Sequence, residues 1–323
     1  MRIARWTHAG TDGEGFVIGD RVVDFPDALT VADVLARGLA ATGELFEAVA
    51  DAAGTPLREV RLRAPLAPAS VRDFVAFEEH VEGVSAGVEG KSHVADEWYE
   101  APTFYFTNPH TILGPADEVS PPVTERLDFE LEVAVVVGAA DSADGANLTA
   151  DAASRHIFGY TIMNDWSARD LQAREMRVRL GPCKGKDFGT TLGPWIVTAD
   201  ELAGFVDPDG FLAVRAEVYV NGSLVGEDLV SNAGWTFPEF VAYASRNSRV
   251  VPGDVLGSGT VGNGGCLGEL WGRNQEVTPP PLRAGDEVRM VVEGIGEITG
   301  RVGQSVAAPS LPPARKRSRA RRR

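Results

Sequence analysis

The sequence is poor in cysteine and contains no long apolar segment. Its 323 residues include only Cys183 and Cys266, too few for a disulfide framework and without the spacing of a metal site. No apolar run approaches the roughly 18 residues of a membrane span, and the first residues lack the apolar core of a signal peptide. We therefore expect a soluble, cytoplasmic protein that does not insert into membranes.

Basic residues are scarce except at the C-terminal end. The chain carries 31 Lys and Arg against 46 Asp and Glu, a net charge of −15. The last nine residues, RKRSRARRR, hold seven of the basic side chains, so the rest of the chain has a net charge of −22. Such an acidic body should repel nucleic acid. We expect residues 309–323 to form a solvated, disordered tail, with binding to RNA, membranes or acidic partners as the alternative.

The remaining sequence divides into two parts. Residues 1–66 mix short strand-like runs with helical patterns such as TVADVLARG and indicate a small α+β N-terminal domain. The segment APLAPAS (residues 64–70) has the composition of a linker. Residues 71–305 form the main domain, which contains no GxxxxGK[ST] phosphate loop. Because strand-like and helical segments also do not alternate regularly, we do not expect a nucleotide-binding fold.

Most of the main domain has the pattern of β-strands. In LAVRAEVYVNGSLVGEDLV apolar and polar residues alternate, and Asn221-Gly222 is a strong hairpin signal. The few helical segments are SARDLQAREMR, opened by a Ser167-x-x-Asp170 capping pattern, and TFPEFVAYASR. We therefore predict an α+β, β-rich fold with a rolled sheet or barrel in its main domain.

An acidic pattern interrupts one of the most apolar runs, RLDFELEVAVVVG from Arg126. Side chains at i and i+2 of a strand share a face, so Asp128, Glu130 and Glu132 should point the same way. Burying several carboxylates together is costly unless a cation binds them. The segment therefore indicates either an exposed acidic face or a Mg²⁺ or Ca²⁺ site with oxygen ligands.

Two further segments could contribute to the same site. The apolar run IFGYTIM ends in Asn164-Asp165, where a carboxylate is either catalytic or caps the following helix, and Gln172 follows in that helix. The segment GPCKGKDFGTT combines glycines with Lys184 and Lys186. Such a loop lets a lysine approach a ligand closely, although both lysines could equally be solvated.

A general base near neutral pH is most often a histidine. His80 lies in VRDFVAFEEHVEG, seven residues after Asp73, and is one of five histidines. Glu269, in the segment that follows Thr260 and a run of glycines, could orient it as in a His–acid pair. A structural or exposed histidine is the alternative.

Taken together, the motifs RDFVAFEEH, LDFELEVAVVVG, MNDWSARDLQ, GKDFGTTLGPW and GDVLGSGTVGNGG resemble the fumarylacetoacetate hydrolase family, in the family's order. The FGTT version is most similar to the fumarylacetoacetase branch. The resemblance implies a β-rich roll, a small N-terminal domain and a homodimer. It also implies metal-dependent hydrolysis of a carbon–carbon bond in a β-diketo acid, a reaction of aromatic compound catabolism. Hydration, isomerisation or decarboxylation of a 2-oxo acid is the alternative within the superfamily.

The resemblance also assigns site residues by position. It implies four carboxylate ligands for a divalent metal, Mg²⁺ in the first place with Ca²⁺ or Mn²⁺ as alternatives: Asp73, Glu130, Glu132 and Asp165. It places Lys186 and Thr190 near the metal, and His80, Glu269, Lys186 and Gln172 as catalytic residues. It implies substrate contacts from Tyr105, Thr260 and Gln172, and leaves Asp128 with a structural role.

The sequence departs from the family pattern at the substrate end of the site. Val75 and Met176 replace aromatic residues, the family's arginine is absent between Val81 and Glu100, where only Lys91 lies, and the LGPCKGK loop is one residue longer. None of these changes touches the four carboxylates. We therefore expect a β-diketo or acylpyruvate-like substrate acid.

Overall fold

The computed structural model describes residues 1–140 and 144–314, so the most basic part of the predicted tail, residues 315–323, lies outside the described residues. Six α-helices occur in the described part of the chain: α1 (Val31–Val49), α2 (Glu78–Glu89), α3 (Ala150–Ser154), α4 (Arg169–Met176), α5 (Phe237–Ser245) and α6 (Leu267–Asn274). The 3₁₀ turns are η1 (Pro26–Ala28), η2 (Leu57–Glu59), η3 (Asp96–Tyr99), η4 (Ala203–Phe205) and η5 (Val230–Asn232). No helix among the described residues is long and apolar enough to cross a membrane.

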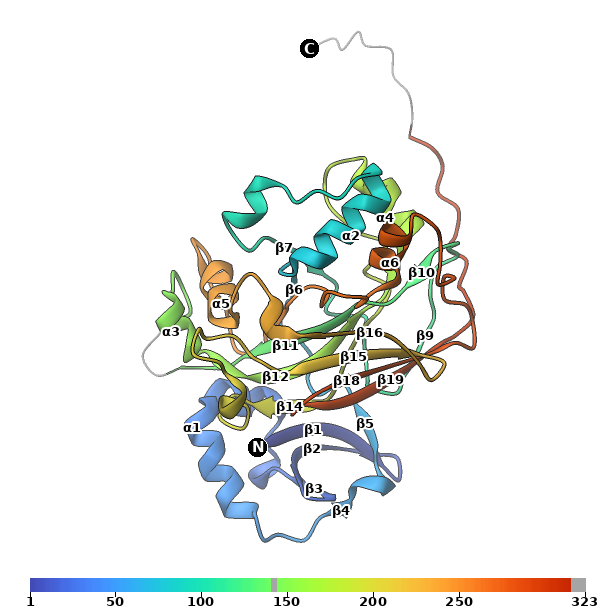
Figure 1. The fold of residues 1–323 in the computed structure, drawn as a ribbon. Coiled ribbons are helices and arrows are strands. Elements are labelled where there is room, and N and C mark those ends of the chain that lie inside the picture. Colours follow the sequence, from blue (N-terminus) through green and yellow to red (C-terminus); the bar gives the residue numbers. More distant parts are fainter. Residues whose placement is uncertain (141–143, 315–323) are drawn as a thin grey trace, which may run out of the picture.

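A 12-stranded sheet runs through the molecule in the order β4-β3-β2-β1-β14-β12-β11-β17-β6-β7, with β5 beside β1 and β8 beside β14 (Figure 1). Its strands are β1 (Arg2–His8), β2 (Thr11–Ile18), β3 (Arg21–Asp24), β4 (Thr55–Pro56), β5 (Arg61–Arg63), β6 (Val71–Phe74), β7 (Phe104–Thr107), β8 (Ile112–Leu113), β11 (Leu131–Val137), β12 (Ile157–Asp165), β14 (Thr190–Thr198) and β17 (Val255–Gly257). The N-terminal strands extend this sheet, because β1 pairs with β14. The division into two domains stays a prediction.

Two smaller sheets complete the fold. One has the order β16-β15-β18-β19-β9, formed by β16 (Ser223–Leu229), β15 (Arg215–Val220), β18 (Glu287–Val292), β19 (Gly296–Val302) and β9 (Glu118–Val119). The other pairs β10 (Leu127–Asp128) with β13 (Ser167–Ala168). Asn221 and Gly222 both have positive φ between β15 and β16, which confirms the predicted hairpin turn. The described sheets are open, so the predicted β-rich fold is confirmed as a mixed roll and not a closed barrel.

The central strands are buried on both faces. All seven residues of β11 and all nine of β12 are buried. One face of these strands packs against the five-stranded sheet and α5, around Phe237 and Phe240. The other face packs against α1 and the N-terminal strands, around Phe16 and Leu35. The centre of the large sheet is therefore a rigid support for side chains that project from strand ends.

Helices α2, α4 and α6 gather at one end of the molecule, over the ends of β6 and β10 (Figure 1). Helices α2 and α6 cross at a glycine contact, since a Cβ on Gly272 would overlap the carbonyl oxygen of Gly83. Glycine at both positions therefore lets the helix that carries His80 touch the helix that carries Glu269.

Candidate active site

Four acidic side chains come together at neighbouring strands of the large sheet. Asp73 lies on β6, Glu132 on β11 and Asp165 at the end of β12, while Glu130 immediately precedes β11. One oxygen from each of Asp73, Glu130 and Glu132 lies within 4.8 Å of the other two. Asp165 joins them through Lys186, whose ammonium group contacts both Asp165 and Glu130. We call Asp73, Glu130, Glu132 and Asp165 the carboxylate cluster.

Strand β17 lies between the strands that carry Asp73 and Glu132. It pairs with β6 at Gly257 opposite Asp73, and with β11 at Gly257 opposite Ala134. A Cβ on Gly257 would lie 2.6 Å from Glu132 Oε2, so the glycine leaves space for that carboxylate. The backbone N–H of Gly259 donates to the same oxygen at 3.1 Å. The local sequence thus fixes the direction of the Glu132 side chain.

The carboxylate cluster contains buried oxygens that the protein leaves unpaired. Asp73 Oδ1, Glu132 Oε1 and Asp165 Oδ1 have no hydrogen-bond partner among the described residues, and these side chains are at most 3% exposed. Burying a carboxylate oxygen without a partner is costly. Several such oxygens facing one another form the ligand set that hard divalent cations prefer. The residues present therefore fit a divalent cation.

The electrostatics of the carboxylate cluster agree with this fit. Burial, followed by repulsion from neighbouring carboxylates, raises the pKa of Asp73 and of Glu132 well above the usual values. Burial also tends to raise the pKa of Glu130. The positive charges of Lys186 and Arg169 have the larger combined effect, however, and the pKa of Glu130 is lowered to about 2. The two protein cations compensate Glu130, and a further cation would be needed to hold Asp73 and Glu132 ionised.

The two lysines of the glycine-containing loop lie in different environments. Lys186 is 3% exposed, and its Nζ lies 2.8 Å from Asp165 Oδ2 and also donates to Glu130 Oε2. Lys184 points outward, with a side chain 67% exposed, and pairs with Asp187 at 2.7 Å. Lys186 is thus the lysine that reaches the carboxylate cluster.

Arg169 connects the carboxylate cluster to α6. Its guanidinium lies 2.7 Å from Glu130 Oε1 and 2.8 Å from Asp128 Oδ2. Asp128 also accepts hydrogen bonds at 2.8 Å from the backbone N–H groups of Leu267 and Gly268, and so caps the first turn of α6. Sequence reasoning missed Arg169, although a position at the start of the helix three residues before Gln172 could have suggested it.

Tyr105 and Thr190 flank Asp165. The Tyr105 hydroxyl donates to Asp165 Oδ2 from β7, where Tyr105 lies opposite Asp73. Thr190 on β14 lies opposite Asp165 in the register with β12, and its buried hydroxyl has no partner among the described residues. Both residues therefore lie at the edge of the carboxylate cluster, and the predicted contact of Tyr105 with substrate stays a prediction.

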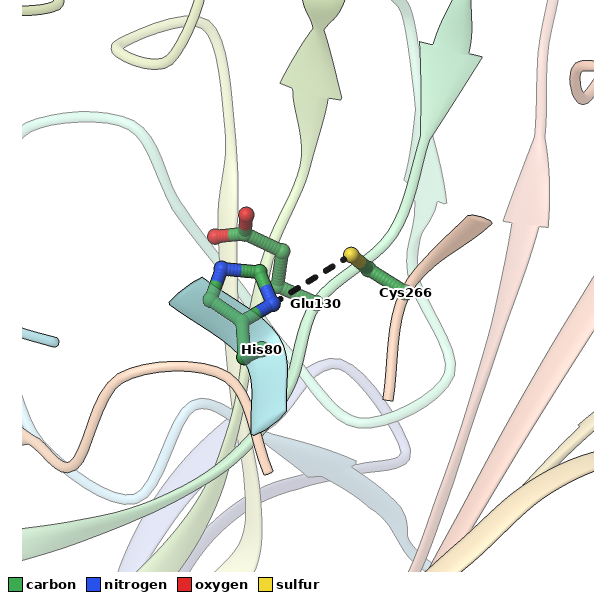
Figure 2. A group of neighbouring side chains, drawn as sticks. All are labelled: His80, Glu130 and Cys266. Atoms are coloured by element: carbon green, nitrogen blue, oxygen red, sulfur yellow. Dashed lines mark hydrogen bonds between the residues drawn. The ribbon is translucent and has the colours of Figure 1, made fainter. Parts of the chain in front are cut away.

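His80 lies on α2 with its two ring nitrogens in different surroundings. Nδ1 is 3.6 Å from the sulfur of Cys266 and 3.9 Å from Glu269 Oε2. The other ring nitrogen is turned toward the carboxylate of Glu130 (Figure 2). Burial, the largest effect, lowers the pKa of His80 to about 4. The imidazole is therefore neutral near pH 7 and has a nitrogen available to accept a proton.

Glu269 on α6 completes the pair that the sequence suggested. The carboxylate is fully buried, and burial raises the pKa of Glu269 to about 7 although Arg273 opposes this rise. Oε1 lies 2.9 Å from Arg273 and accepts from the Gly264 N–H at 3.1 Å, while Oε2 is left without a hydrogen bond in the described structure. The free oxygen is the one nearer to His80.

Gln172 and Thr260 make no hydrogen bond to the carboxylate cluster in the described structure. Gln172 on α4 accepts a hydrogen bond from Arg169 at 3.2 Å and so connects to the carboxylate cluster through one side chain. Thr260 is buried three residues beyond the end of β17, but its hydroxyl makes no hydrogen bond to another described residue. Its predicted contact with substrate stays a prediction, as does that of Gln172.

Residues 69–303 match the family model described as "Fumarylacetoacetate (FAA) hydrolase C-terminal". The chain belongs to the fumarylacetoacetate hydrolase family. The resemblance drawn from the sequence motifs is therefore confirmed. This is a family of enzymes, and its members differ in the reaction they catalyse.

Curated relatives of the family illustrate that difference. The chain is 31% identical over 297 residues to the fumarylacetoacetase of Bos taurus, covering 73% of this chain and 70% of that protein. It is 28% identical over 250 residues to the oxaloacetate tautomerase YisK of Bacillus subtilis (strain 168), covering 76% and 74%. Both a hydrolase and a tautomerase are thus similar to this chain.

Solved structures share the fold across nearly the whole chain. The fumarylacetoacetate hydrolase of Exiguobacterium antarcticum superposes with a TM-score of 0.72 at 25% identity, covering 94% of this chain and 99% of that one. Maleylpyruvate hydrolase from Sphingobium sp. SYK-6, in complex with manganese(II) ion and pyruvate, gives a TM-score of 0.69 at 21% identity, covering 95% and 100%. The N-terminal part of the chain thus belongs to the shared architecture.

Proposed function

We propose that this protein is a divalent-cation-dependent hydrolase that cleaves a carbon–carbon bond in a β-diketo acid. The observation that carries the proposal is the carboxylate cluster with unpaired oxygens directly beside His80 and Glu269. A site for a hard cation next to a neutral histidine suits the activation of water against a chelated dicarbonyl. Fumarylacetoacetate-like and acylpyruvate-like acids have the required 1,3-dicarbonyl group.

Asp73, Glu130, Glu132 and Asp165 would hold the cation. Oxygen ligands favour Mg²⁺, with Ca²⁺ or Mn²⁺ as alternatives, and the manganese bound by maleylpyruvate hydrolase is in accord with a divalent ion. When bound, the ion would polarise the two carbonyl oxygens of the substrate and lower the energy of the departing enolate. Tyr105 and Lys186, which both contact Asp165, hold that ligand in place.

His80 would act as the general base. The ring nitrogen that faces Glu130 accepts the proton of a water molecule, and the hydroxide attacks the substrate carbonyl carbon. Glu269, near Nδ1, orients the ring and stabilises the imidazolium that forms. The ammonium of Lys186 and the amide of Gln172 stabilise the negative charge that develops on the substrate oxygens. The carbon–carbon bond beside the attacked carbonyl then breaks, its electron pair stays on the leaving fragment, and the proton on His80 passes to that carbanion.

Proton transfer without water attack is the second candidate function. The similarity to an oxaloacetate tautomerase favours tautomerisation or isomerisation of a 2-oxo acid at the same carboxylate cluster. Decarboxylation of such an acid, or hydration, in which water adds to a carbon–carbon double bond, is the further alternative. These reactions need the cation and a proton acceptor, and they do not need a water molecule activated for attack on a carbonyl.

One assay separates these candidates. The purified protein is incubated with fumarylacetoacetate, acylpyruvates, oxaloacetate and unsaturated 2-oxo diacids, each with Mg²⁺, Mn²⁺ or EDTA. Hydrolysis yields two acids, whereas tautomerisation changes the keto–enol ratio without breaking the carbon skeleton. We expect two acid products from a β-diketo acid in Mg²⁺ or Mn²⁺ and none in EDTA. Turnover confined to oxaloacetate would instead identify a tautomerase or decarboxylase.

We also propose that the protein forms a homodimer, as the family resemblance implies. Sedimentation equilibrium of the full chain tests this directly, because a dimer has twice the 34.4 kDa of one chain. A single species of one chain mass at assay concentration would contradict the proposal.

A further inference from the structure

Three possible metal ligands of different chemistry meet beside the carboxylate cluster. His80 comes from α2, Glu130 from the segment before β11, and Cys266 from the residue that precedes α6. One ligand atom from each lies within 4.8 Å of the other two, and all three side chains are buried. Figure 2 shows the sulfur and the imidazole facing each other. The sequence analysis found no metal-site spacing for the two cysteines. Cys266 and His80, which the fold brings together, are 186 residues apart in the sequence.

The distance between the sulfur and the imidazole nitrogen suits a tetrahedral metal. Zinc binds thiolate sulfur at about 2.3 Å and imidazole nitrogen at about 2.0–2.1 Å, so at a tetrahedral angle these two atoms are about 3.6 Å apart. In the structure, Cys266 Sγ and His80 Nδ1 are 3.6 Å apart. A metal can therefore join them without a change in their separation.

A second observation points to a ligand at this place. Glu269 Oε2 is buried, lacks a hydrogen-bond partner among the described residues and lies 3.9 Å from the same nitrogen, His80 Nδ1. An unpaired buried oxygen raises the free energy of the site unless something compensates it. A cation held by Cys266 and His80 would lie close enough to provide that compensation.

We propose that Cys266 Sγ and His80 Nδ1 bind a thiophilic divalent cation such as Zn²⁺, with Glu130, which pairs with Arg169 and Lys186 in the structure, as the third ligand. Sulfur ligands select zinc or cadmium over Mg²⁺ and Ca²⁺, so this site differs from the carboxylate cluster although both use Glu130. On binding, the sulfur–metal bond replaces the S–H bond, and the thiol proton is released to solvent. No change of oxidation state is involved.

Occupation of this site would inhibit the enzyme. The metal takes His80 Nδ1 away from Glu269 and fixes the ring, and it also competes for Glu130. The inhibition therefore rests on the proposed role of His80, whereas the binding of the metal does not. Zinc would then lower turnover in the presence of Mg²⁺.

Binding is tested by spectroscopy, without any assay of activity. Co²⁺ is titrated into the full chain in excess Mg²⁺, and the near-ultraviolet thiolate-to-cobalt charge-transfer absorption is recorded. We expect one cobalt per chain with this absorption in the native protein and in Cys183→Ser, which removes the exposed cysteine. The Cys266 sulfur accepts a hydrogen bond from the Glu269 backbone N–H at 3.3 Å at the start of α6. Cys266→Ser keeps an oxygen acceptor at this position and should lose the absorption. If Cys266→Ser does not fold, His80→Gln should weaken cobalt binding at least tenfold.

Inhibition is tested next, in saturating Mg²⁺ with the substrate that the assay above identifies. The zinc concentration for half-inhibition should rise at least tenfold in Cys266→Ser, each variant being compared with its own zinc-free rate. Equal zinc sensitivity and no charge-transfer absorption would overturn the site and place the zinc at the carboxylates. Absorption without inhibition would keep the site and overturn its effect on His80. If no carbon–carbon hydrolysis is found, the cobalt titration still decides the site.

Discussion

Gly272 on α6 and Gly83 on α2 touch through their backbones, and no side chain fits between them. A Cβ on Gly272 would overlap the Gly83 carbonyl oxygen, and a Cβ on Gly87, one turn along α2, would lie 3.2 Å from Gly272 Cα. This helix crossing brings His80 within 3.9 Å of Glu269. The geometry of the proposed catalytic pair thus depends on residues that take no part in the chemistry.

We predict that Gly272→Ala forces α6 away from α2. Overpacking of this kind typically costs about 1–3 kcal/mol of unfolding free energy, and the separation of His80 from Glu269 should lower kcat further. Denaturant unfolding and steady-state kinetics measure both effects. The matched control is Gly43→Ala in α1, where the added Cβ meets no atom within 4 Å. It should stabilise the protein by about 0.5–1 kcal/mol, and equal behaviour of the two variants would contradict the packing argument.

Lys186 and Lys184 give a second matched pair. Lys186→Met removes a buried partner of both Glu130 and Asp165, and breaking a buried ion pair typically costs about 3–5 kcal/mol. Lys184→Met removes an exposed pair and should cost at most about 1 kcal/mol. Urea unfolding in EDTA measures both values. Saturating Mn²⁺ should recover part of the loss in Lys186→Met, because the cation compensates the same carboxylates; no recovery would count against a cation at this cluster.

His156 predicts a pH dependence of stability away from the active site. This side chain is 4% exposed, its Nε2 has no partner among the described residues, and its Nδ1 lies 3.3 Å from the Gly138 carbonyl oxygen. Burial, aided by Arg155 and opposed by the Gly138 carbonyl and Asp144, lowers the pKa of His156 below its usual value of 6.5. Below pH 6.5 the unfolded chain therefore binds a proton that the folded chain does not, and the free energy of unfolding falls as pH falls.

The substitution His156→Gln should make this dependence shallower. The free energy of unfolding of the native protein and of the variant is measured with urea between pH 7.5 and 5. The difference between the two pH profiles gives the contribution of His156, because the carboxylates titrate in both proteins. Replacement of the exposed His8 by glutamine is the control for the loss of a histidine at the surface. A parallel pH profile for His156→Gln and the native protein would show that His156 contributes nothing.

The strand pattern predicted part of the carboxylate cluster and could not predict the rest. It placed Glu130 and Glu132 on one side, and they do converge. Asp128, expected on the same face from periodicity alone, is drawn away because β10 pairs with β13 and its carboxylate caps α6. The regular alternation is broken between β10 and β11, which a two-residue period does not reveal.

Local sequence was also misleading at the start of α4. The capping pattern predicted a helix opened by Ser167, but Ser167 lies in β13, and its hydroxyl donates to the Asp165 carbonyl. Asp170 instead accepts from Thr124 and Glu125, which are remote in sequence. Tertiary hydrogen bonds compete with local caps, and a single sequence contains no signal for such partners.

His80 provides the most direct test of the proposed mechanism. His80→Gln removes the proton acceptor and retains Asp73, Glu130, Glu132 and Asp165. A general base typically contributes 10²–10⁴-fold to the rate, so kcat for carbon–carbon hydrolysis should fall by about that factor. The affinity for Mn²⁺, measured calorimetrically, should change little because the four carboxylates remain. His8→Gln, at an exposed position on β1, should retain full activity.

The two measurements together distinguish a base from a structural residue. A buried histidine with a purely structural role would alter cation affinity and unfolding free energy along with kcat, since α2 packs directly on α6 beside the cluster. A base alters kcat alone. Equal loss of kcat and of Mn²⁺ affinity would therefore show that His80 has a structural role. Full activity of His80→Gln would show that another group activates the water molecule. A tautomerase would show a third pattern, in which His80→Gln loses proton exchange at the substrate carbon and no fragment acids form in either protein.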